Sequence, residues 1–190
     1  MKLNLITISI VFFTSFSVFY SYSQQPLKKE FQPFNMTLEE VVAEIKPYNG
    51  PTSGEQVETN TVLGKVMCGY QGWFRAPGDG SGQGWVHWGR RGEFNPKMLT
   101  IDYWPDTREL NDAEKYPTDF KHADGSTAYV FSSMNKITVL RHFEWMKEAG
   151  IHGVFLQRFI NGTEPARKLY GYTKVLENVQ EGANTHGRSW

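Results

Sequence analysis

The sequence feature that most constrains the fold is a continuous apolar run at residues 151–159, IHGVFLQRF, which becomes polar only at its end. Such runs are typical of strands in a parallel sheet, where both faces are covered. Helical patterns flank this run on both sides. The first begins at Ser132 or Ser133 and ends at Gly150, and the second ends at Gly187. The run is therefore predicted to be a strand between two helices.

A second apolar run, at residues 62–68, predicts another buried strand, and it is followed by a glycine-rich loop. Residues 98–103 are expected to form a short extended segment. The polar segment from there to Gly125 is predicted to be a long loop that is either functional or a lid. Residues 129–131 are again expected to be extended. This order of strands and helices predicts an α/β fold built from βα units, namely the N-terminal part of a (β/α)8 TIM barrel.

Residues 1–23 have the pattern of a secretory signal peptide, with Lys2, an apolar stretch and small residues before a cleavage position after Ser23. A membrane anchor is the alternative, and hydroxyl side chains within the short apolar span disfavour it. We therefore expect a secreted or periplasmic protein with no stable membrane insertion once the signal is cleaved. The single cysteine, Cys68, permits no intramolecular disulfide, and we expect its thiol to be buried.

Residues 24–61 are predicted to be a leader. It contains a helix at residues 36–45, because Thr37 and Glu40 have capping-box spacing, and then a loop rich in proline and glycine. Residues 62–190 supply the barrel portion, which is short for a whole barrel of about 250 residues. We therefore expect the N-terminal part of a longer protein, with a complete small domain as the alternative.

Charge and composition narrow the class of ligand. The chain has 20 Lys and Arg against 20 Asp and Glu, and its basic residues form no run, so nucleic acid is not an expected partner. Aromatic residues make up 15% of the chain, and all six tryptophans follow the signal segment. This composition is common in proteins that handle carbohydrate, so we expect an oligo- or polysaccharide as the partner.

Aromatic side chains gather in the loop that follows the first predicted strand. In a (β/α)8 barrel, ligand groups lie at the carboxyl ends of the strands and in the loops after them. Ring faces stack on flat, hydroxyl-rich ligands, and polar tips orient them. The candidate contacts in this loop are Tyr70, Trp73, Trp85, His87 and Trp88. The alternative is a loop folded over its own aromatic core.

Two further groups of candidate sugar contacts follow. They are Asp102, Tyr103, Trp104 and Asp106 in the next loop, and Gln157 and Arg158 at the end of the second predicted strand. The aspartates could contact the ligand, cap turns or take part in catalysis. Because side chains alternate along a strand, one of Gln157 and Arg158 should face the barrel axis and the other the helices.

His87 lies between two tryptophans and could either orient a sugar hydroxyl or bind a metal. A metal site needs further ligands at suitable spacing, and the other histidines form no such motif. Hydrogen bonding to the ligand is therefore the preferred role, and we expect neither a metal nor a cofactor.

Five segments together resemble the glycoside hydrolase family 71/99-like group, which includes endo-acting α-mannosidases and mannanases. These segments are residues 69–74 (GYQGWF), 85–88 (WVHW), 102–110 (DYWPD followed by EL), 142–145 (His and Trp on a helix) and 149–154 (AGIHGV). The resemblance covers about residues 62 to 160 and implies a (β/α)8 barrel with an open, glycan-binding face.

The resemblance also implies catalytic carboxylates in a later strand and loop, in a word such as Asn-Glu-Trp-x-Glu-Gly, which the 190 residues do not contain. Glu144 and Glu148 imitate that word, but they are predicted to lie on a solvated helix face. The expected function is thus an exported glycoside-hydrolase-like protein of which this chain, inactive by itself, supplies the sugar-binding wall. The alternatives are a non-catalytic secreted glycan-binding protein and a small interaction domain unrelated to sugar.

Overall fold

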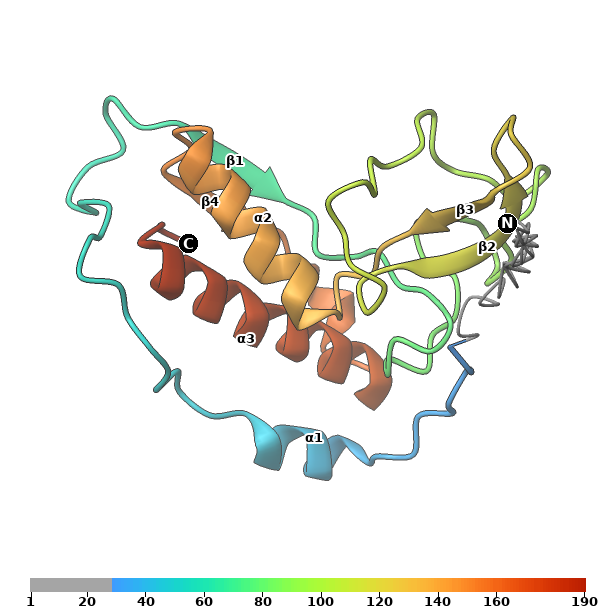
Figure 1. Cartoon of the computed structure of the whole chain (residues 1–190). Coiled ribbons are helices and arrows are strands. Elements are labelled where there is room, and N and C mark those ends of the chain that lie inside the picture. Colours follow the sequence, from blue (N-terminus) through green and yellow to red (C-terminus); the bar gives the residue numbers. More distant parts are fainter. Residues whose placement is uncertain (1–28) are drawn as a thin grey trace, which may run out of the picture.

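The computed structural model describes residues 29–190, so the predicted signal segment and the first residues of the leader lie outside the described part of the chain. Two small sheets and three α-helices make up the fold (Figure 1). The elements in chain order are α1 (Leu38–Glu44), β1 (Met67–Tyr70), β2 (Tyr116–Lys121), β3 (Thr127–Val130), α2 (Lys136–Glu148), β4 (Gly153–Leu156), a 3-10 turn (Ile160–Gly162) and α3 (Ala166–His186).

The parallel pair formed by β1 and β4 is the centre of the first unit. Met67 pairs with Gly153 and Tyr70 with Leu156, and Ser189 adds a parallel bridge on the other side of Gly153. Helices α2 and α3 cover one face of this sheet (Figure 1). The core between them consists of Tyr70, Val139, Phe143, Val154, Val175, Val179 and Ala183.

The opposite face of the β1–β4 sheet is open. Phe155, which points away from the helices, is 60% exposed, and its partner Gly69 is also exposed. Within residues 29–190 the sheets do not close into a barrel. The βα order that motivated the barrel prediction is nevertheless present in β1, α2, β4 and α3.

The predicted helices are confirmed, with shifted starts. Asn135, rather than Ser132 or Ser133, caps α2, because its side chain accepts hydrogen bonds from the N–H groups of Ile137 and Thr138. Helix α3 ends at His186 and is capped by Gly187, which has the left-handed φ of 64° that favours glycine. A Cβ at this position would collide with the backbone of Glu55.

Helix α1 confirms the capping-box prediction, since Thr37 and Glu40 exchange both of the expected hydrogen bonds. Val41 is its one buried residue, while Val42 on the neighbouring face is 53% exposed. The helix contacts α3 and lies at the outside of the molecule (Figure 1).

Two of the predicted extended segments are wrong in part. The strand expected at residues 62–68 begins only at Met67, which pairs with Gly153, the first residue of β4. Of the residues before Met67, Val66 still bonds to His152, whose N–H donates to the Val66 oxygen at 2.9 Å. Residues 62–65 form a turn in which Leu63 is 83% exposed. Residues 98–103 form no strand, and Cys68 is only half-buried.

The segment predicted to be a long loop contains β2, which pairs antiparallel with β3 and has an irregular register between Pro117 and Lys121. The proline and the polar residues of YPTDFK obscure the strand pattern in the sequence. This hairpin packs with the glycine-rich loop around a second core of Ala76, Trp88, Phe94, Tyr116 and Val130.

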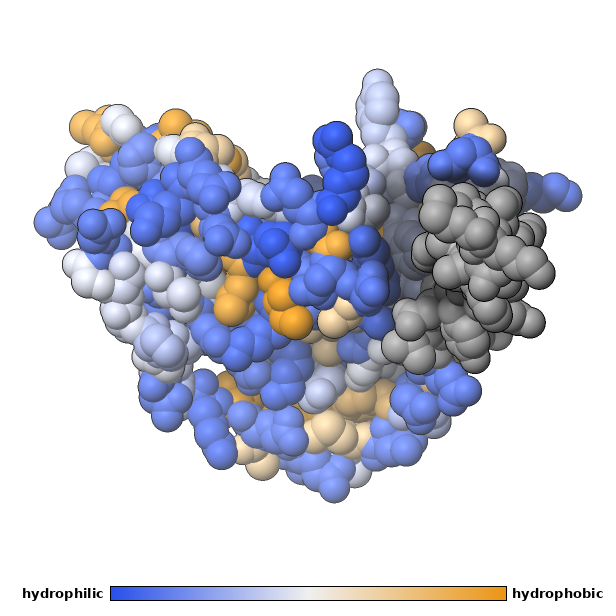
Figure 2. Space-filling model, viewed as in Figure 1, coloured by the Kyte–Doolittle hydropathy of each residue, from blue (hydrophilic) through white to orange (hydrophobic). Residues whose placement is uncertain are grey.

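The surface seen in Figure 2 is mainly hydrophilic, with small apolar groups near its middle. None of the helices in the described part of the chain is long and apolar enough to cross a lipid bilayer.

We predict that Phe143→Ala lowers the free energy of unfolding by about 3–5 kcal/mol, because the ring is fully buried between the sheet and α3. Ile137→Ala on the same helix is the control, since Ile137 is 46% exposed and its loss should cost about 0.5 kcal/mol. Chemical denaturation measures both values. Equal losses for the two variants would contradict the placement of this core.

Candidate functional site

The carboxyl ends of β1 and β4 bring three exposed or half-buried rings together. The ring of Trp73 lies next to those of His87 and Phe159, with centroid distances of 5.0 Å to each. Trp73 Nε1 also donates a hydrogen bond of 3.1 Å to the backbone oxygen of Gln157, which joins the loops after the two strands. We call Trp73, His87 and Phe159 the strand-end cluster.

The strand-end cluster presents apolar ring surface beside a neutral imidazole. Phe159 is 55% exposed, and His87 is exposed with a left-handed φ of 62°. Although His87 is exposed, the neighbouring rings of Trp73 and Phe74 partly desolvate its imidazole, and this desolvation, followed by the charge of Arg75, lowers the pKa of His87 below its usual value. His87 is therefore uncharged at neutral pH and can both donate and accept a hydrogen bond. Among residues 29–190, no three His, Cys, Asp or Glu side chains are placed to hold a metal ion.

Arg75 holds the loop that carries Trp73, and the sequence reasoning did not identify it. Its side chain is buried, and Nη1 donates to the backbone oxygens of Gly72 and Phe74 at 2.9 and 3.0 Å. These two carbonyls lie on either side of Trp73. Arg75 therefore fixes the backbone from which this ring projects.

The other tryptophans of the predicted site belong to the second core. Trp88 is 2% exposed and donates from Nε1 to the backbone oxygen of Phe131, so the prediction of an exposed platform is wrong for this residue. Trp85 packs on Phe94 at 5.1 Å, and Trp104 stacks on the same ring at 5.7 Å. For these rings the alternative interpretation, a loop folded over its own aromatic core, describes the structure.

The remaining predicted contacts are dispersed. Tyr103 is 90% exposed and Asp102 is also exposed. Gln157 lies beside Gly69 on the open face of the sheet, whereas Arg158 lies 5.9 Å from the ring of Tyr172 on α3. This arrangement agrees with the expected alternation of these two side chains.

A pocket of about 400 Å³ lies between α2 and the segment of residues 105–110. Asp106 is the only predicted contact within it. The lining consists of Pro105, Asp106, Glu109, Leu110, Phe131, His142 and Trp145. Sequence reasoning missed this site because three separate segments form it. The spacing of His142 and Trp145, three residues apart on a helix whose core residue is Phe143, was the signal that could have found it.

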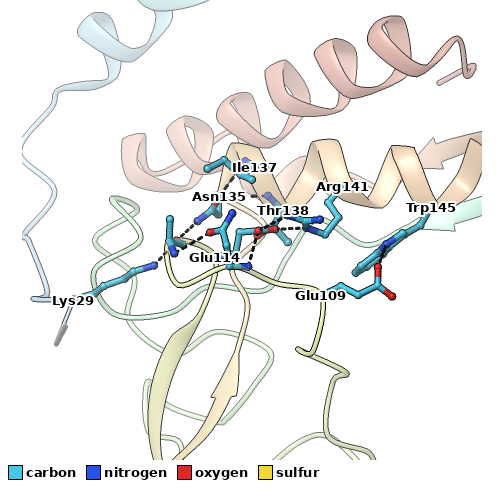
Figure 3. A network of polar contacts seen from close by, with 10 residues as sticks. Lys29, Glu109, Glu114, Asn135, Ile137, Thr138, Arg141 and Trp145 are labelled. Atoms are coloured by element: carbon cyan, nitrogen blue, oxygen red, sulfur yellow. Dashed lines mark hydrogen bonds and ion pairs between the residues drawn. The ribbon is translucent and has the colours of Figure 1, made fainter. Parts of the chain in front are cut away.

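The two carboxylates of the pocket are held in different ways. Asp106 accepts hydrogen bonds from the backbone and the guanidinium of Arg108, which lower the pKa of its carboxyl to about 2. It thereby caps a turn, one of the roles expected for it. Glu109 instead accepts a hydrogen bond of 2.8 Å from Trp145 Nε1 (Figure 3).

His142 connects the pocket with the core. Its Nδ1 lies 2.8 Å from the hydroxyl oxygen of Tyr70, which is the last residue of β1 and is buried. Burial, and to a lesser extent the charge of Arg141, lowers the pKa of His142 to about 4, although Glu114 acts in the opposite direction. Burial also raises the pKa of Tyr70. Both groups are therefore neutral at pH 7.

A buried ion pair fixes the wall behind the pocket. Glu114 accepts hydrogen bonds from Arg141 Nε and Nη2 at 2.9 and 2.8 Å and from the N–H of Asn111 at 3.0 Å (Figure 3). Burial alone would raise the pKa of Glu114, but these bonds outweigh it and hold the pKa below the usual value. The pair joins α2 to the segment that carries Glu109.

No protein-family model, curated protein or solved structure matches the chain. The function therefore has to be inferred from the arrangement of the chain's own residues.

We predict that His142 makes the protein less stable in acid. Its pKa falls from 6.5 to about 4 on folding, so the unfolded chain binds a proton first as the pH decreases. The stabilisation present above pH 6.5 should be lost between pH 6.5 and 4, by about 3 kcal/mol in total. Chemical denaturation at a series of pH values measures this slope.

In that experiment His142→Gln should flatten the profile across the same window. His122→Gln is the matched control, because it removes an exposed histidine that does not line the pocket. An identical slope in the parent protein and in His142→Gln would show that His142 is not the responsible group.

Proposed function

We propose that this chain is the sugar-binding part of an exported, (β/α)8 glycoside-hydrolase-like protein that acts on glycans. The proposal combines the resemblance to the glycoside hydrolase family 71/99-like group with the place of the strand-end cluster. The partner is an oligo- or polysaccharide, and the protein works in the periplasm or outside the cell.

The single observation that carries the proposal is the meeting of Trp73, His87 and Phe159 at the carboxyl ends of two parallel strands. Ligands of barrel enzymes bind at this edge of the sheet. Ring faces provide area for a sugar ring, and the uncharged imidazole provides a hydrogen bond to a hydroxyl. Ring stacking and hydrogen bonding to a neutral imidazole both suit an uncharged ligand.

The open face of the β1–β4 sheet also supports a barrel. In a (β/α)8 barrel, helices cover the outside of the strands and the other face turns inward. Here α2 and α3 cover one face, and Phe155 and Gln157 lie on the other. The parallel bridge to Ser189 follows α3, as a further strand would.

Catalysis is not assigned to any residue of the chain. Glu144 and Glu148 are exposed on α2 and do not line the pocket, which agrees with their interpretation as a solvated face. The strand-end cluster itself contains no carboxylate, whereas glycoside hydrolysis uses two. The resemblance implies that the catalytic carboxylates come from a later strand and loop, and the alternative is a non-catalytic secreted glycan-binding protein that uses the same rings.

We predict that Trp73→Ala and Phe159→Ala weaken binding to α-mannan and mannose-containing oligosaccharides by about threefold to tenfold, the range expected for one aromatic contact. Melting temperatures should change little, because both rings lie outside the two cores. Calorimetric titration and thermal unfolding give the two quantities for each variant.

Two controls separate binding from stability. Phe155→Ala removes an equally exposed ring from β4 outside the cluster and should leave affinity unchanged. Trp88→Ala removes a core ring and should cost about 3–5 kcal/mol of stability. The proposal is wrong if the parent protein binds no glycan, or if the cluster variants bind like the parent.

A further inference from the structure

The pocket beside α2 offers mainly aromatic surface to a ligand. The ring centroids of His142 and Trp145 are 5.6 Å apart, and Phe131 meets His142 edge to face at 5.4 Å. Pro105 and Leu110 complete the apolar lining. A volume of about 400 Å³ with few polar groups is typical of small-molecule sites.

The charge of this lining is negative. Asp106 is neutralised by Arg108, whose Nε donates to Oδ1 and whose Nη2 donates to Oδ2 of the carboxylate. Glu109 has no cationic partner among residues 29–190, and its hydrogen bond from Trp145 Nε1 orients the carboxylate without cancelling its charge. The pocket thus retains one uncompensated carboxylate next to an indole ring.

The nearest positive charges are already paired with other carboxylates. Arg108 and Arg141 lie close enough to interact electrostatically with Glu109, but Arg108 is paired with Asp106 and Arg141 with Glu114. Among residues 29–190, no lysine or arginine lines the pocket. His142 is neutral at pH 7, because burial holds its pKa at about 4. The described lining therefore offers an anionic ligand two carboxylates and no cationic side chain.

We propose that the pocket binds a small organic monocation, such as a quaternary ammonium compound, with its charge against Glu109 and the ring of Trp145. Aromatic faces attract such cations, and a carboxylate adds a full opposite charge. Carboxylates also accept hydrogen bonds from hydroxyl groups, so a neutral sugar is the competing ligand, and charge is the property that separates it from an organic cation. The inference is independent of glycan binding, since the pocket and the strand-end cluster share no residue.

Choline and its uncharged carbon analogue, 3,3-dimethylbutan-1-ol, test this directly, because the two differ in charge far more than in shape. Both are titrated into the protein while backbone amide NMR signals are followed. We expect choline to bind about tenfold more tightly than the alcohol, which corresponds to about 1.4 kcal/mol. The largest signal changes should occur at Glu109, His142 and Trp145.

Variants assign the preference to the pocket. Glu109→Gln keeps the size of the side chain and should reduce the preference for choline over the alcohol to the part that the ring of Trp145 supplies, whereas Trp145→Leu should remove that part and weaken choline binding. Glu144→Gln is the matched control, because it removes an exposed carboxylate from α2 outside the lining. Thermal unfolding verifies that each variant is folded. If Trp145→Leu does not fold, the choline affinity of Glu109→Gln alone tests whether the pocket binds the cation.

Three results would overturn the inference. The first is the absence of choline binding at millimolar concentration, and the second is equal affinity of the parent protein for choline and the alcohol. The third is an equal loss in Glu144→Gln and Glu109→Gln, which would indicate a diffuse surface field. Binding of neutral sugars at these signals, without choline, would identify the pocket as a glycan subsite instead.

Discussion

The parallel pairing of β1 with β4 is the contact on which the rest of the structure depends. It joins segments far apart in the sequence, and the helix between them, α2, has to lie across one face of the pair. That face becomes the core, and the loops leaving the two strands meet at one edge. The position of Trp73 beside Phe159 is a direct consequence, because each ring follows one of the paired strands.

Two buried charges stabilise local geometry in different ways. Glu114 is paired with Arg141, so its desolvation is offset by an opposite charge and by the N–H of Asn111. Arg75 relies on backbone carbonyls, and its Nε has no partner among the described residues. Replacing a whole buried ion pair with apolar residues is often neutral for stability, whereas removing only one of its partners is strongly destabilising. In this structure Glu114 and Arg75 act by positioning the backbone, since each holds a segment that carries an exposed ring or carboxylate.

Features that depend on local chemistry could be predicted from the sequence. The capping box of α1, the helical period of α3 and the glycine after it are all local. Strand β2 could not be predicted in the same way, because its pairing with β3 is a tertiary contact that overrides a polar, proline-containing sequence. Nor does the sequence distinguish Trp88, which turns into the core, from Trp73, which does not. The pocket escaped prediction because its lining assembles only after folding.

Helix α2 serves the core with Phe143 and the pocket with His142 and Trp145. Both sets of side chains point in the right direction only if the helix keeps its rotation about its own axis, because each residue of an α-helix turns by about 100°. A single-residue insertion after Leu140, inside the helix, would rotate His142, Phe143 and Trp145 together by about 100° relative to the first turns of α2 and misplace all three. Substitutions can alter the core or the pocket separately, but changes of length cannot. The helix is therefore a segment where descendants of this sequence can vary in composition while their residue count is held constant.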